Sequence, residues 1–89
     1  MVNRAFLISG RVQGVFFRDS TKKEAIKLGL RGSATNLSDG TVKVCLRGEI
    51  NKINLLETWL HIGPELAEVE SVIDVDIDQQ LELNDFKVS

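Results

Sequence analysis

The chain is organised around residues 10–18, Gly10-Arg11-Val12-Gln13-Gly14-Val15-Phe16-Phe17-Arg18. Gly10 and Gly14 let the backbone bend so that successive N–H groups point inward, and Arg18 adds a planar cation. A short apolar run, residues 5–8, precedes this stretch, and a helix-like pattern, residues 19–28, follows it. The order of strand, glycine loop and helix N-terminus is that of a phosphate-binding loop.

The spacing excludes two better-known phosphate loops. A Walker-type loop requires a Gly-Lys-Ser/Thr ending, and residues 10–18 contain no lysine. Phosphatases with a thiolate nucleophile place a cysteine six residues before their arginine, where this chain has Val12. The loop can therefore bind an anion but brings no nucleophile. A plain glycine-rich turn is the alternative, and the combination of both glycines with Arg18 disfavours it.

Length and composition describe one small domain. The chain has 89 residues, of which 43% are hydrophobic and 27% charged, so residues 1–89 are expected to form a single domain. A net charge of −2 disfavours nucleic acid as a partner. One cysteine, Cys45, and one histidine, His61, cannot form an intrachain disulfide or a Cys/His zinc site.

Nothing in the sequence indicates export or a membrane. The apolar run near the N-terminus is too short for a signal peptide, and no later stretch approaches a membrane span. We expect a cytoplasmic protein that works as a monomer, with no membrane partner.

Hydrophobic periodicity predicts the elements on either side of the loop. Residues 4–9 are apolar on both faces, which predicts an internal strand. Residues 19–28 predict an amphipathic helix that ends at Gly29. Thr21 and Glu24 also have capping-box spacing, so the start of this helix is open by a few residues.

A β-hairpin is predicted around Asp39-Gly40, a dipeptide that favours tight turns. Its second arm alternates, with one face formed by Val42, Val44 and Leu46 and the other by Thr41, Lys43, Cys45 and Arg47. Cys45 is therefore expected on the more polar face. It has no neighbouring base or helix N-terminus that would mark a nucleophile, which predicts a bystander thiol.

The second half of the chain predicts one more helix and two strands. Residues 49–61 have an apolar stripe formed by Ile53, Leu56, Trp59 and Leu60, and Gly63-Pro64 ends it. Trp59 is expected in the core, and His61 is expected in solvent without a catalytic role. Residues 69–78 predict a strand, with Ile73, Val75 and Ile77 facing inward and Asp74, Asp76 and Asp78 outward. These aspartates lack the glycine and glutamate of a calcium loop, and residues 85–88 predict a short edge strand.

The resulting order β-α-β-β-α-β predicts the α+β class. It is typical of a ferredoxin-like split βαβ sandwich, with two helices on one face of a mostly antiparallel sheet.

The sequence resembles the acylphosphatases over most of its length. Two motifs carry the resemblance, residues 10–18 and the run Asn36-Leu37-Ser38-Asp39-Gly40-Thr41-Val42, together with Ala25, Gly29-Leu30, Gly32, Gly48 and Gly63-Pro64. The resemblance implies hydrolysis of the carboxyl-phosphate bond of a small acyl phosphate by direct attack of water, without metal or cofactor.

The resemblance also implies the site residues. Arg18 corresponds to the phosphate-binding arginine of the family, and Asn36 to its water-positioning asparagine. The phosphate cradle is implied in the backbone N–H groups of Val12, Gln13, Gly14, Val15, Phe16 and Phe17. The chain departs from the family at Ser33, often an aromatic residue there, and at Val88-Ser89, where arginine or tyrosine is usual.

Three alternatives remain at this point. A non-catalytic phosphate- or ligand-binding ferredoxin-like module would have the same fold, although simple binding does not require Asn36. Asn36 could instead support the hairpin through a bond from its side chain to the backbone. The chain could also correspond to a domain of a larger carbamoyl-transferring maturation protein; Met1 and the lack of zinc-finger cysteines favour a free-standing enzyme.

Overall fold

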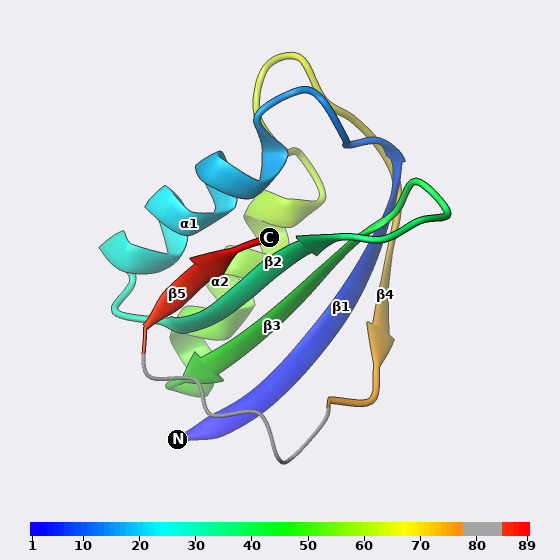
Figure 1. Ribbon diagram of the computed structural model, residues 1–89. Coiled ribbons are helices and arrows are strands. Elements are labelled where there is room, and N and C mark those ends of the chain that lie inside the picture. The colour runs from blue at the N-terminus through cyan, green and yellow to red at the C-terminus, as the bar shows by residue number, and fades with distance from the viewer. Residues whose placement is uncertain (78–84) are drawn as a thin grey trace.

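The computed structural model describes residues 1–77 and 85–89, which form a five-stranded sheet and two helices (Figure 1). In chain order the elements are β1 (Val2–Arg11), α1 (Phe17–Lys27), β2 (Arg31–Asn36), β3 (Val42–Gly48), α2 (Ile50–Leu60), β4 (Glu68–Val75) and β5 (Phe86–Val88). The predicted β-α-β-β-α-β order is confirmed, and β5 is the predicted edge strand near the C-terminus.

The strands lie in the order β4-β1-β3-β2-β5. β1 pairs antiparallel with β3 and β4, β2 pairs antiparallel with β3, and β5 runs parallel to β2. Both helices cover the same face of this sheet (Figure 1). The structure therefore has the predicted ferredoxin-like α+β sandwich with a mostly antiparallel sheet.

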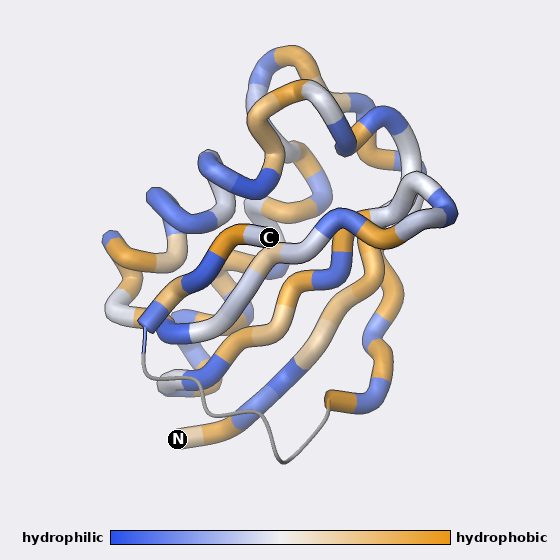
Figure 2. Tube along the Cα trace, in the orientation of Figure 1, coloured by the Kyte–Doolittle hydropathy of each residue, from blue (hydrophilic) through white to orange (hydrophobic). Residues whose placement is uncertain are grey.

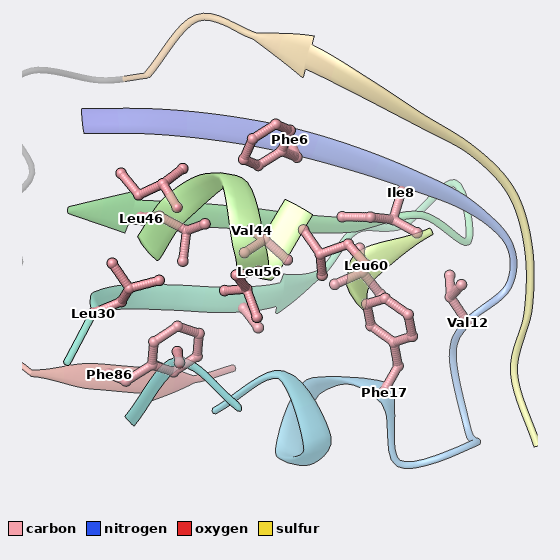
Figure 3. Close-up of a cluster of buried hydrophobic side chains, with 14 of the residues drawn as sticks. Phe6, Ile8, Val12, Phe17, Leu30, Val44, Leu46, Leu56, Leu60 and Phe86 are labelled. Carbon is pink, nitrogen blue, oxygen red and sulfur yellow. The ribbon is translucent and has the colours of Figure 1, made fainter. Parts of the chain in front are cut away.

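The core lies between the helices and the sheet. Fully buried side chains from all these layers meet there, among them Phe6 and Ile8 of β1, Val44 and Leu46 of β3, Phe17 of α1, and Leu56 and Leu60 of α2 (Figure 3). Ile53 of α2 belongs to the same cluster. The outward side of α1 is hydrophilic (Figure 2). Burial of one apolar face per element is the main force that holds such a sandwich together.

Both helices lie close to the ranges predicted from hydrophobic periodicity. α1 begins at Phe17, two residues before the predicted start, and α2 spans residues 50–60 with His61 as its exposed C-cap. Trp59 is half-buried, and its ring centroid lies 5.8 Å from that of Phe17. Each helix has 11 residues, and none in the described ranges is long and apolar enough to span a membrane.

Cys45 corrects one prediction. It lies on the face of β3 away from Val44 and Leu46, as the alternation requires, but it is 5% exposed rather than on a polar surface. Ala5 of β1 lies opposite Cys45 in the sheet, and Val75 of β4 packs against the pair. Val75 and Ile77 pack against Ala5 and Cys45, which is why the thiol is buried although its neighbours along β3 are polar.

β4 agrees only in part with the prediction. Asp74 and Asp76 are exposed as predicted, and Val75 and Ile77 are half-buried, but they pack against Ala5 and Cys45 on the face of the sheet away from the helices. Phe6 faces the core and pairs with Asp74, whereas Ile73 lies on the opposite face and is 53% exposed. Asp74 is held beside the core by Arg4, whose Nη2 donates to both carboxylate oxygens at 2.8 Å. Alternation shows which residues share a face but not which face meets the helices. Asp78, also in this prediction, lies outside the described residues.

Candidate active site

The loop between β1 and α1 is fixed by its own side chains. Val12 and Val15 are 1% and 4% exposed, and Phe17, at the start of α1, is 1% exposed. Val12 and Phe17 lie at the same end of the core (Figure 3). Gly14 and Phe16, between them, are exposed. The buried side chains of Val12, Val15 and Phe17 therefore fix the loop against the core.

The backbone N–H groups of the loop form a run of free donors. Val12 N donates to Gly10 O at 3.1 Å, and the next backbone bond is from Ser20 N to Phe16 O at 3.0 Å. Among the described residues, the N–H groups of residues 13–19 have no hydrogen-bond acceptor. They include the N-terminus of α1, where unpaired donors and the helix dipole favour an anion.

Two backbone conformations give the loop its shape. Gly10 has φ 119°, and a Cβ atom there would lie 2.2 Å from Glu68 O, so β4 approaches too closely for any side chain. Phe16 has φ 63° and ψ 23°, the left-handed region. That conformation costs about 1–3 kcal/mol for a non-glycine residue and is concentrated at functional sites. The strain supports a functional loop.

A hollow of about 250 Å³ opens at this loop, lined by Val12, Gly14, Phe16, Phe17, Arg18 and Asp19. Five of the eight predicted site residues therefore line one cavity. The other three do not: Gln13 lies beside it, Val15 is buried beneath the loop, and Asn36 is on β2.

Arg18 and Asn36 meet at one main-chain oxygen. Arg18 Nη1 donates to Ser89 O at 2.8 Å, and the backbone N of Asn36 donates to the same oxygen at 2.9 Å. Ser89 N in turn donates to Ala34 O at 2.9 Å, which extends the pairing of β5 with β2. The role of Ser89 is missing from the sequence prediction, because a main-chain oxygen leaves no signal in residue identity.

Gln13 joins the loop to the turn that follows Asn36. Its Nε2 donates to Leu37 O at 2.8 Å and to Thr41 O at 2.9 Å. Both protons of the side-chain amide are used, so the loop and the β2–β3 turn hold each other in place. The sequence predicts a role for the backbone N–H of Gln13 only. The structure shows that its side chain also connects the loop to the β2–β3 turn.

The side chain of Asn36 takes no part in the hairpin. Its Oδ1 is buried, and no donor in the described part of the chain reaches it. The turn is held instead by Asp39, whose Oδ1 accepts hydrogen bonds from Thr41 Oγ1 at 2.6 Å and Thr41 N at 3.0 Å. These two bonds lower the pKa of Asp39. The geometry thus favours a role for Asn36 other than turn support.

Known proteins are similar to this chain in both sequence and fold. Residues 4–88 match the family described as Acylphosphatase. An acylphosphatase of Nitrosococcus oceani is 53% identical over 66 residues, covering 74% of each chain. One of Pasteurella multocida is 40% identical over 88 residues, covering 99% of this chain and 98% of that one. The structure of an acylphosphatase from Coxiella burnetii superposes with a TM-score of 0.88 at 40% identity, covering 98% of this chain and 90% of that one.

Proposed function

Because the chain belongs to the acylphosphatase family, its activity is the hydrolysis of small acyl phosphates, and we propose that the loop, Arg18 and Asn36 carry it out. An acyl phosphate is a mixed anhydride with a good carboxylate leaving group. The enzyme mainly has to hold the phosphoryl oxygens and direct a water in line with the leaving group. The family evidence favours this activity over a non-catalytic binding module.

The phosphoryl group binds to the loop and the start of α1. The observation that carries this proposal is the run of N–H groups from Gln13 to Asp19 that have no acceptor among the described residues, because Gly14, Phe16 and Phe17 of this run line the same hollow as Arg18. One Nη of Arg18 donates to Ser89 O, and the other N–H groups of the planar fork then hold the phosphoryl oxygens. Single donors of this kind are worth about 2.7–4 kcal/mol in the transition state.

Asn36 orients the attacking water. An amide cannot act as a base at neutral pH, but its oxygen can accept a hydrogen bond from the water. The water oxygen forms a bond to phosphorus as the bond from phosphorus to the acyl oxygen breaks. The carboxylate leaves with that electron pair, and the second water proton passes to a phosphoryl oxygen. The products are carboxylate and inorganic phosphate, and no residue becomes covalently attached.

The reaction proposed here needs no metal or cofactor. The groups that meet the phosphoryl oxygens are N–H donors and a guanidinium, which are not metal ligands. We also propose that residues 1–89 form one domain and that the protein works as a monomer in the cytoplasm, which rests on composition and length.

The direct experiment measures phosphate release from acetyl and benzoyl phosphate by the purified protein in EDTA. We expect turnover that is insensitive to EDTA and competitive inhibition by inorganic phosphate, because product and substrate share the loop. Loss of activity in EDTA with recovery in magnesium would contradict the mechanism. Inhibition by phosphate that leaves the apparent KM unchanged would contradict the site.

A further inference from the structure

Phe16 is an apolar residue that the fold turns outward at the site. Its side chain is 71% exposed, whereas Val15 and Phe17 on either side are 4% and 1% exposed. Its left-handed backbone is a conformation that glycine and asparagine adopt more readily than an aromatic residue. An exposed ring in a strained conformation adds nothing to the core, which indicates a contact outside the protein.

The ring shares a cavity with the phosphoryl-binding groups. Phe16 and Arg18 line the same hollow, and Asn36 does not. In an in-line displacement the water and the leaving group lie on opposite sides of phosphorus. Because the proposed phosphoryl site is at this hollow, the acyl group attached to the phosphorus lies within reach of the exposed ring of Phe16.

We propose that the ring of Phe16 contacts the acyl group and sets how strongly this enzyme distinguishes an aromatic acyl phosphate from acetyl phosphate. This inference rests on the proposed function of the loop. A flat apolar ring beside an anion site fits a substrate with one charged end and one apolar end. A benzoyl group can stack on the ring, whereas an acetyl group offers one methyl. Such a contact corresponds to about a three- to tenfold gain in kcat/KM.

The test is the ratio of kcat/KM for benzoyl phosphate to kcat/KM for acetyl phosphate, compared between variants so that the intrinsic reactivities cancel. Phe16→Asn keeps a residue that tolerates the left-handed backbone but removes the ring, and Phe16→Tyr keeps the ring. Ile62→Ala is the control, because Ile62 is 68% exposed and lies outside the lining of the hollow. We expect the ratio to fall about three- to tenfold in Phe16→Asn and to stay at the wild-type value in the other two.

An equal loss for both substrates in Phe16→Asn would show that Phe16 acts through its backbone alone and would overturn the proposal. If that variant does not fold by circular dichroism, Phe16→Gly takes its place, because glycine also removes the ring and readily adopts the left-handed backbone. An unchanged ratio in that variant would then overturn the proposal. Wild-type protein that hydrolyses neither of these substrates would instead refute the proposed function, and this inference with it.

Discussion

Asn36→Ala separates catalysis from folding. If Asn36 orients the water, its loss leaves the loop donors and Arg18 in place, so phosphate still binds while the attacking water is no longer directed. Loss of one well-placed group of this kind lowers kcat by about 10²-fold or more. The inhibition constant of phosphate is expected to change by less than about threefold, because the interaction is made mainly in the transition state.

The structure also sets the expected change in stability. A buried acceptor without a donor costs about 1–3 kcal/mol, and Asn36 Oδ1 is such an atom among the described residues. The substitution removes this unpaired acceptor, and the energy gained offsets the packing lost with the rest of the side chain. The free energy of unfolding should therefore change by less than about 1 kcal/mol. The backbone bond from Asn36 N to Ser89 O does not depend on the side chain and should persist.

Asp39→Ala is the matched control, because Asp39 accepts both hydrogen bonds that hold the turn. It should lower the melting temperature while turnover at low temperature persists. The assay compares melting temperature, phosphate inhibition and kcat for both variants. A destabilised but active Asn36→Ala would refute the water-orienting role, since that is the result expected of a turn-supporting asparagine.

Three further predictions concern the parts around Asn36. Arg18→Lys should impair phosphate binding and kcat together, because an ammonium cannot hold Ser89 O and the substrate in one planar fork. The control is Arg31→Lys, at the exposed start of β2. Near-normal kinetics of Arg18→Lys would show that Arg18 has only a structural role. Gln13→Met should lower kcat about tenfold, since both bonds to the turn are lost; unchanged steady-state kinetics would remove its positioning role. Gly32→Ala should lower the free energy of unfolding, measured in urea, by about 3 kcal/mol or more, because the added Cβ would lie 1.8 Å from Cys45 O. A variant as stable as the wild type would contradict the close approach of β2 and β3.

The element order could be predicted because each element has one clear period. The stripe of α2 recurs at helical spacing, and its members Ile53, Leu56 and Leu60 are all fully buried. The alternation in β3 likewise places Val44 and Leu46 in the core. The boundaries of the elements were harder to predict. α1 starts two residues before the predicted start because Phe16 adopts a left-handed backbone, and no side-chain pattern encodes that conformation.

The errors arose where partners across the sheet decide burial. Cys45 has polar neighbours along its own strand, but it is buried because Val75 and Ile77, which are distant in the sequence, pack against it and Ala5. Asp74 faces the helix side because Arg4 is there to pair with it. Arg4 and Asp74 are far apart in the sequence, so neither local periodicity nor propensity contains this information.

The candidate site shows the same division between local and distant contacts. The loop is anchored by Val12 and Val15, which belong to the motif itself, so its position before α1 could be predicted from the sequence, although Val12 N, predicted as a cradle donor, is bonded to Gly10 O. Arg18 and the backbone of Asn36 depend instead on Ser89 O, which follows the three-residue strand β5. A shift of β5 would move the guanidinium and leave the loop donors where they are. Because Arg18 contributes to phosphate binding as well as to charge stabilisation in the transition state, phosphate affinity and turnover would then fall together, so both depend on this short edge strand.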